Sequence, residues 1–193
     1  LSLFIIGPGV MYAQSPAAVQ AQMTGAVRGD NTDPPAPVPP AVINRTEQGR
    51  ATIRATRLQR PLRIDGRLDE PIYTELTSIS DFIQQEPIEG GTASEKTEVW
   101  LTYDDNNIYV SVRCWETHPE RTVRREMRRD NTVIFRAGHD AIGFMFDTFH
   151  DRRSGYIFNV NAVGGRTDGQ FPNERQYNGD WNPVWRVRSA RFD

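Results

Sequence analysis

The sequence has a single cysteine, Cys114, and three histidines among its 193 residues. One thiol cannot form an internal disulfide, so the fold has to be stabilised by a packed core. The histidines, His118, His139 and His150, are too far apart in the sequence to match a local zinc motif. The composition therefore excludes a disulfide-based scaffold and does not indicate a zinc site.

Positive charge is not in excess, because 23 lysines and arginines accompany 25 aspartates and glutamates, for a formal net charge of -2. Proteins that bind nucleic acid usually carry a clear cationic excess or a basic stripe, so no nucleic-acid partner is expected. The segment RTVRREMRRD, residues 121–130, is a local exception that could hold an anion or an acidic partner. Its neighbouring and interspersed acidic residues favour the alternative of a solvated segment with paired charges.

Long apolar runs are also missing, and a transmembrane helix needs about 18 such residues or more. The apolar run LSLFIIGPGVMYA, residues 1–13, instead has the length of the apolar region of a secretory signal and ends in a small residue. Neither an initiating methionine nor a basic stretch precedes it. Residues 1–13 are therefore predicted to be a partial signal peptide, and the protein is expected to be exported.

The segment that follows, residues 14–50, is rich in alanine, proline, glutamine and glycine. Within it, PPAPVPP at residues 34–40 favours an extended polyproline conformation. The segment has few large apolar residues with which to offset the entropy of ordering the chain. It is predicted to be a mobile linker, and residues 51–193 are predicted to form the folded domain.

Apolar and polar residues alternate with a period of two beyond this linker, which is the pattern of half-buried strands. Turn-forming residues separate the runs. Asp69-Glu70-Pro71 predicts the start of a short helix that ends near Leu76. The sequence thus predicts an all-β fold, an antiparallel β-sandwich with one short helix. The predicted strands span residues 52–58, 97–103, 108–115, 141–147, 156–161 and 185–192.

The run from Thr97 to Trp115 predicts a hairpin, because a four-residue turn at residues 104–107 would pair Tyr103 with Ile108. Val99, Leu101 and the apolar residues in phase with them then form its inner face. The other face carries two tryptophans, so either another segment of the chain covers this face or the face binds a ligand or partner. Large exposed apolar patches are rare on soluble domains, which favours a covering segment. This second face consists of Glu98, Trp100, Tyr109, Arg113 and Trp115.

A polar cluster separates the predicted strands at 141–147 and 156–161. Asp147 and Asp151 could act as the paired carboxylates of a glycosidase, which stand about 5–9.5 Å apart. They could also donate oxygens to calcium, as could residues 104–107, although neither segment matches an EF-hand loop. A loop dense in aspartate, arginine and serine is equally an ordinary hairpin tip. The sequence has no G-x-S-x-G, S-x-x-K or glycine-rich phosphate motif, so a hairpin tip is predicted and no catalytic residue is assigned.

Three segments taken together resemble the family 9 carbohydrate-binding domain. They are LRIDGRLDEPIY at residues 62–73, residues 81–116, and residues 139–171. The resemblance is closest to the version found at the N-terminus of large exported bacterial proteins whose later part resembles an outer-membrane β-barrel. It implies a jelly-roll-like β-sandwich that binds carbohydrate without catalysis and has a link to carbohydrate catabolism.

The resemblance also implies a location in the periplasm or outer membrane of a Gram-negative bacterium, with a barrel following in the same chain. The strand predicted at residues 185–192 has no returning partner, so the domain is expected to be incomplete at its C-terminal end. An alternative function is an interaction or plug-like domain that contacts its own barrel or a partner protein through the second face of the hairpin. A part in a glycoside hydrolase is a further alternative.

Sugar-binding members of this family hold the end of a glycan between two aromatic side chains, close to the aspartate that matches Asp140. Where those members have tryptophan, glutamate and arginine, this sequence has Ala137, Gly143 and Asn159. The resemblance therefore implies a ligand site built from local substitutes, each of which could equally be a core residue. These are Phe135, Asn159, Trp181 and Trp185. No cofactor is predicted, with structural calcium left open.

Overall fold

The computed structural model describes residues 2–6, 33–47, 50–84, 86–123, 125–135 and 140–192, of which residues 2–6 and 135 are described by their backbone alone. The described residues fall into two compact units. The first unit contains residues 2–6, Ile83–Ser94 and residues 118–192, and the second contains residues 33–82 and 95–117. None of the described helices is long and apolar enough to cross a membrane.

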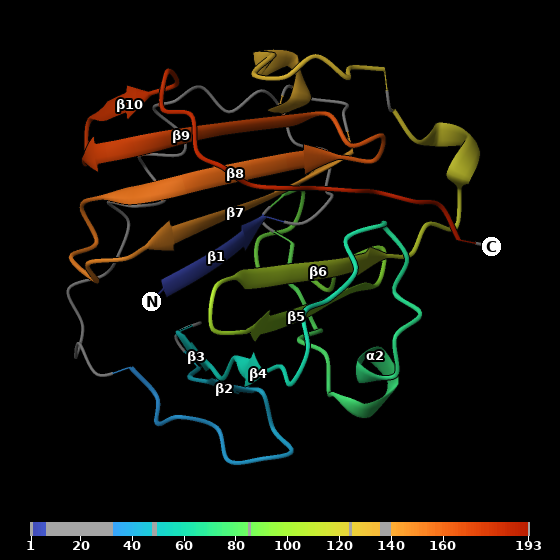
Figure 1. The fold of residues 1–193 in the computed structure, drawn as a ribbon, viewed down its shortest axis with the longest axis vertical. Helices are drawn as coiled ribbons and strands as arrows, with labels where there is room; N and C mark the ends of the chain where they lie inside the picture. The colour runs from blue at the N-terminus through green and yellow to red at the C-terminus, as the bar shows by residue number, and fades with distance from the viewer. Residues whose placement is uncertain are drawn as a thin grey trace. The chain divides into compact units, whose positions relative to one another are not determined.

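The first unit is built on a five-stranded sheet in the order β1-β7-β8-β9-β10, in which every neighbouring pair is antiparallel (Figure 1). The predicted strands at 141–147 and 156–161 are confirmed as β7 and β8. Strand β1 lies inside the predicted signal peptide, whose residues 7–13 are outside the described part of the chain, so that assignment stays a prediction. The strands are β1 (Ser2–Ile6), β7 (Ala141–Asp147), β8 (Gly155–Asn161), β9 (Arg166–Asn173) and β10 (Gln176–Asn178).

The two faces of this sheet carry different side chains because successive residues of a strand point to opposite sides. One face holds a buried cluster of Met145, Ile157 and Phe171. The other holds partly exposed aromatic residues, with the rings of Phe144 and Phe158 stacked at 5.3 Å between centroids. Two short 3-10 helices, η1 (Pro119–Arg121) and η2 (Thr132–Phe135), precede β7, and η2 packs against β8 and β9.

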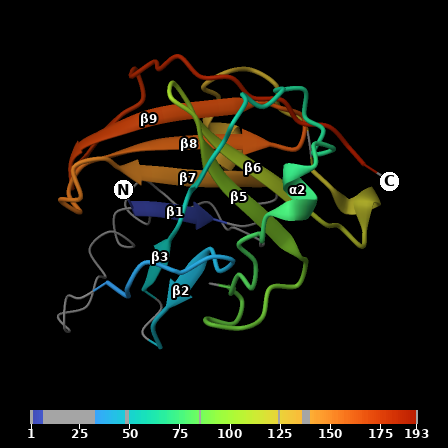
Figure 2. The same ribbon diagram turned by 60° about the horizontal axis from the view of Figure 1, so that its bottom comes forward.

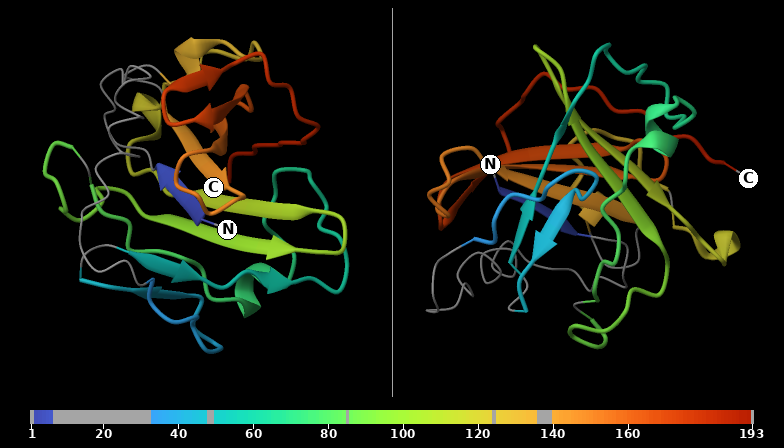
Figure 3. Two further views of the ribbon diagram at one scale, coloured as in Figure 1. Left: turned by 90° about the vertical axis from the view of Figure 1, so that its left-hand side faces the viewer. Right: turned by 90° about the horizontal axis from the view of Figure 1, so that it is seen from below.

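The second unit contains a two-stranded and a three-stranded sheet (Figure 3). β2 and β3 form an antiparallel pair, and β2 lies inside the segment predicted to be linker, whose residues 14–32 are outside the described residues. The predicted strand at 52–58 is divided between β3 and β4, which belong to different sheets. β4 runs parallel to β5, against the antiparallel expectation. The elements are β2 (Ile43–Arg45), β3 (Ala51–Ile53), β4 (Thr56–Arg57), α2 (Ile72–Glu75), β5 (Thr97–Tyr103) and β6 (Ile108–Cys114).

The predicted hairpin is confirmed in its register, since Tyr103 pairs with Ile108 and Glu98 with Arg113. Its turn is fixed by Asp104, whose Oδ1 accepts hydrogen bonds from the backbone N–H groups of residues 106 and 107, each at 2.8 Å. The Tyr109 hydroxyl donates to the second oxygen of this carboxylate at 2.6 Å. These bonds hold the pKa of the Asp104 carboxyl below its usual value, with the Tyr109 bond as the largest cause.

A segment of the same unit covers Trp100, as the hairpin's second face led us to expect. Figure 2 shows α2 beside the hairpin, and the Tyr73 ring meets the Trp100 ring edge-on at 5.3 Å. The Trp100 indole N–H donates to the Leu76 carbonyl at 3.2 Å, and the Arg113 guanidinium lies 5.5 Å from the indole ring. Trp100 is only 4% exposed as a result. The predicted helix is confirmed as α2, although its N-cap is Pro71 and no side chain caps it.

The strand predicted at residues 185–192 is wrong, because this stretch has no strand pairing. It runs in an extended conformation along the sheet of the first unit (Figure 1). Strands β9 and β10 were not predicted from the sequence. The all-β class is confirmed in the described residues, where α2 is the one α-helix and the strands form three sheets.

Candidate functional site

The polar cluster between β7 and β8 is the tip of a hairpin, as predicted. Asp147 is 3% exposed, and its carboxylate accepts hydrogen bonds from the backbone N–H groups of Asp151 and Arg152 at 3.2 and 2.7 Å. The Asp151 carboxylate accepts the N–H groups of Arg153 and Ser154, each at 2.8 Å. These backbone hydrogen bonds, that of Arg153 first, keep the pKa of the Asp151 carboxyl below its usual value. Both candidate catalytic carboxylates are thus engaged in shaping their own loop.

The described part of the chain contains no group of three or more histidine, cysteine, aspartate or glutamate side chains placed to share a metal ion. The oxygens of Asp104 and Asp151 that could have served calcium accept hydrogen bonds from their own turns. Structural calcium therefore stays an open, untested alternative.

Three arginines of the arginine-rich segment, Arg121, Arg128 and Arg129, lie within ion-pair distance of carboxylates. Glu126, 8% exposed, accepts hydrogen bonds from the Arg128 guanidinium at 2.8 and 3.1 Å, from the Arg128 backbone N–H at 2.8 Å and from the Asn131 amide at 2.6 Å. The Arg128 side chain and backbone lower the pKa of Glu126 to about 2. The pairing favours the reading of a solvated, charge-compensated segment over that of an anion site.

This low pKa predicts a specific acid sensitivity. The Glu126 carboxyl has a reference pKa of 4.5 and a folded-state value of about 2, so ionisation favours the folded state. Its contribution is fully present above the reference value and is lost as the pH falls through the folded value. We expect the stability difference between the native protein and Glu126→Gln to be constant above pH ~5 and to shrink toward pH ~2. Urea midpoints measured across this range test it, and a difference independent of pH would contradict it.

Two of the four predicted ligand residues lie together on the aromatic face of the first unit's sheet. The Trp181 ring packs against Tyr156 at 4.7 Å between centroids and meets Phe158 edge-on at 5.7 Å. The Trp185 ring meets Phe158 edge-on at 5.1 Å. All four side chains are partly exposed. We call Tyr156, Phe158, Trp181 and Trp185 the tryptophan face.

Charged and amide groups border the tryptophan face. Asp168, only 2% exposed, accepts the Trp185 indole N–H at 2.9 Å and a hydrogen bond from Arg129 at 3.0 Å. The same Arg129 nitrogen donates to the side-chain oxygen of Asn182. The Arg166 guanidinium lies 5.4 Å from the Trp185 ring. A ligand at this face would therefore meet aromatic rings and hydrogen-bonding groups within the same region.

The other two predicted ligand residues do not join this group. Asn159 follows Phe158 in β8 and so points to the opposite face of the sheet, where it is 2% exposed. Its amide nitrogen donates to the Thr167 hydroxyl at 3.2 Å, while its side-chain oxygen has no hydrogen-bond partner. The side chain of Phe135 lies outside the described part of the chain, as do residues 136–139, which include Ala137.

Sequence reasoning missed the remaining members of the site. The alternation in residues 156–161 does place Tyr156 and Phe158 on a common face, and this signal was available from the sequence. Asp168 and Arg166 carried no local signal, because β9 was not predicted. Asp168 meets its partners at separations of 17 and 39 residues, which no short pattern reveals.

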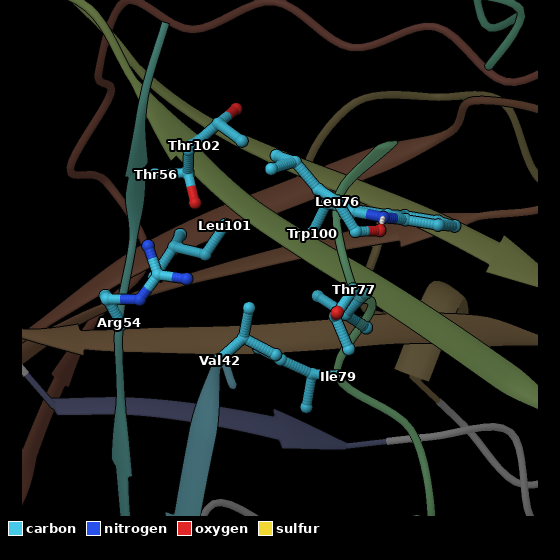
Figure 4. A pocket seen from close by; sticks show the side chains of 10 residues that line it. Val42, Arg54, Thr56, Leu76, Thr77, Ile79, Trp100, Leu101 and Thr102 are labelled. Atoms are coloured by element: carbon cyan, nitrogen blue, oxygen red, sulfur yellow. Dashed lines mark hydrogen bonds between the residues drawn. The ribbon is translucent and has the colours of Figure 1, made fainter. Parts of the chain in front are cut away.

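The second unit has a small pocket at the edge of β5 (Figure 4). Most of its lining is aliphatic or aromatic, and Arg54 is the one charged residue. The Arg54 Nε–H donates to the Ala41 carbonyl at 3.2 Å, and the buried Thr102 hydroxyl has no hydrogen-bond partner. The pocket has few of the convergent polar groups that mark a ligand site. It is lined by Val42, Arg54, Thr56, Leu76, Thr77, Ile79, Val99, Trp100, Leu101 and Thr102.

Comparison of the chain with protein-family models, with curated proteins and with solved structures finds no match in any of the three. The tryptophan face is therefore the observation from which a function is inferred.

Proposed function

We propose that this chain is a non-catalytic carbohydrate-binding-like domain of an exported, outer-membrane-associated protein, and that a glycan contacts the tryptophan face. The observation that supports this most directly is the placement of Trp181 and Trp185 on one face of a sheet, with rings that remain partly exposed. Aromatic rings offer a flat apolar surface to the C–H groups of a sugar ring, while nearby polar groups can bond its hydroxyls.

The polar groups that suit sugar hydroxyls are those at the rim of the tryptophan face. Asn182 is exposed and Arg166 is partly exposed, so both can reach a bound ligand. Asp168 is buried and its carboxylate already accepts hydrogen bonds from Arg129 and Trp185, so it supports the face without touching a ligand. The proposed site thus resembles other small-ligand sites in combining apolar contact area with a few oriented polar groups.

The remaining parts of the proposal are supported by the sequence. It favours a jelly-roll-like β-sandwich, a role linked to carbohydrate catabolism, and an outer-membrane β-barrel downstream in the same chain. The apolar run at residues 1–13 supports export to the periplasm or outer membrane.

Replacement of Trp181 by alanine tests the glycan proposal. We expect the native chain to bind at least one member of an oligosaccharide panel in isothermal titration. The Trp181→Ala form should bind about tenfold more weakly, because a stacked ring contributes roughly 1 kcal/mol or more. Trp115→Ala is the matched control, because Trp115 is 41% exposed and belongs to the other unit. If the native chain binds no glycan at millimolar concentration, the proposal fails.

The alternative function, contact with a partner protein or with the barrel through the hairpin's second face, has fewer exposed residues to rely on than the sequence suggested. Trp100 and Tyr109 are buried, so of the aromatic residues on the hairpin's second face only Trp115 is exposed. Its indole N–H donates to Glu98 at 3.1 Å, and the Lys96 ammonium lies 5.8 Å from its ring. A single tryptophan with these contacts is a smaller surface than the tryptophan face, which is why the glycan proposal is preferred.

A further inference from the structure

We propose that Asp168 is a positioning residue that holds the segment bearing both tryptophans against the sheet. We call residues 181–189 the covering segment. The inference rests on the proposed function only where it concerns glycan affinity, because the attachment itself is a property of the structure alone.

The covering segment is extended, yet it belongs to no sheet. Trp181, Pro183, Trp185 and Val187 are partly buried, while the residues between them are exposed. This alternation shows that every second side chain turns toward the rest of the unit. No backbone-to-backbone hydrogen bond joins the covering segment to another described residue. Side chains must therefore supply its attachment.

The polar side-chain contacts of the covering segment converge on Asp168. The carboxylate accepts the Trp185 indole N–H at 2.9 Å. It also fixes Arg129, which donates to both the carboxylate and Asn182. Trp185 is thus held directly and Asn182 through one arginine. A third polar contact, from Arg166 to the Trp185 carbonyl at 3.2 Å, comes from the same strand, β9.

Burial makes the Asp168 contacts costly to lose. The Asp168 side chain is 1% exposed, whereas that of Arg129 is 34% exposed. A buried carboxylate that loses its partners is strongly unfavourable, so the attached arrangement is favoured over a detached one. The contacts of the Trp181 and Trp185 rings with Phe158 also hold the segment by packing, but such contacts depend less on the orientation of the rings than the hydrogen bonds to Asp168 do. Asp168 therefore sets the direction of the Trp185 ring and, through Arg129, the position of Asn182 at the rim.

Limited proteolysis of the whole chain tests the attachment without any glycan. Arg186 and Arg188 are exposed residues of the covering segment, and trypsin cuts after arginine when the backbone can open locally. Because hydrogen bonds to charged groups are among the stronger ones, Asp168→Asn is expected to speed cleavage after these two arginines about tenfold. Trp185→Phe, which keeps a ring but removes the N–H donor, should speed it several-fold.

The controls separate local release from general unfolding. Glu120→Gln alters a carboxylate whose side chain is 66% exposed, and should leave cleavage after Arg186 and Arg188 unchanged. Cleavage after Arg57 and Arg63, exposed residues of the other unit, serves as an internal reference. Unchanged cleavage after Arg186 and Arg188 in both variants would overturn the proposal. A rise that is matched at Arg57 and Arg63 would overturn it as well, since it would report loss of the fold.

Glycan affinity supplies the second readout. The test uses a glycan that the native chain binds. We expect the affinity of the Asp168→Asn form for this glycan to be about tenfold lower than that of the native chain, although the buried carboxylate does not touch the ligand. Equal affinity despite faster cleavage would overturn the positioning role while leaving the attachment in place. Faster cleavage together with no glycan binding by the native chain would support the attachment and refute the proposed function.

Discussion

Replacing Phe171 with alanine is expected to lower the free energy of unfolding by about 3–5 kcal/mol. Phe171 is 2% exposed and lies with Met145 and Ile157 in the buried cluster of the first unit's sheet. Its ring centroid is 5.3 Å from that of Tyr177. Truncation removes the apolar contact area and leaves a cavity beside Met145 and Ile157, and both effects destabilise the fold. Urea denaturation followed by circular dichroism measures the loss.

The control for this substitution is Phe149→Ala in the loop between β7 and β8. Phe149 is 73% exposed, so its removal takes little apolar surface out of a packed environment. We expect its effect to stay within about 0.5 kcal/mol. Comparable losses at Phe149 and Phe171 would show that the face carrying Phe171 is not the core of this unit.

Replacing Trp100 with alanine is expected to destabilise the second unit by a similar amount, about 3–5 kcal/mol. Trp100 is 4% exposed, and the segment around α2 covers it through the Tyr73 ring and the Leu76 carbonyl. The substitution removes the surface on which this segment packs and leaves the Leu76 carbonyl without its donor. Arg113 also loses the ring beside which it lies. Chemical denaturation followed by circular dichroism is again the measurement.

Trp115→Ala is the matched control for this second prediction. Trp115 lies on the same face of the hairpin but is 41% exposed, and its indole N–H bonds to Glu98. Loss of one such bond is expected to cost about 1 kcal/mol. An equal effect at the two tryptophans would mean that α2 and its flanking residues do not depend on Trp100 for their packing.

The hairpin was predictable because its determinants are local. The turn at residues 104–107 contains the aspartate whose carboxylate accepts the turn's own backbone N–H groups. Period-two alternation on either side then fixes the register and assigns each residue to a face. The same reasoning found β7 and β8, which are also joined by a short polar loop. Residues that interact at small separations leave a readable pattern.

The strand predicted at residues 185–192 shows where alternation misleads. The covering segment alternates because its side chains pack toward the rest of the unit, and this needs an extended backbone without a hydrogen-bonded neighbour. Pro183 is compatible with such a segment, because it has no N–H to contribute to a ladder. An alternation of apolar and polar residues therefore indicates an extended backbone with one buried and one exposed side. It does not by itself indicate that the segment pairs with a neighbouring strand.

Strand β9 was missed for the opposite reason. Its sequence, RTDGQFPN, contains glycine, proline and aspartate, all of which are uncommon in the interior of a strand. A Cβ atom at Gly169 would lie 2.3 Å from the Tyr177 ring, so the glycine makes room for an aromatic residue of β10. Asp168 is tolerated because Arg129 and Trp185 satisfy it. Gly169 and Asp168 are thus explained by partners that lie outside β9.

The loop between β7 and β8 places a limit on how this hairpin can vary among related sequences. Asp147 at the end of the strand and Asp151 inside the loop together accept four backbone N–H groups of residues 151–154. Each carboxylate can accept these hydrogen bonds only if the number of residues between it and its N–H donors stays the same. An insertion between the two aspartates would separate Asp147 from both of its donors, and one after Asp151 would do the same to Asp151. We therefore expect the loop length to change in related sequences only together with these two residues, and Phe149, which contributes no such bond, to vary independently.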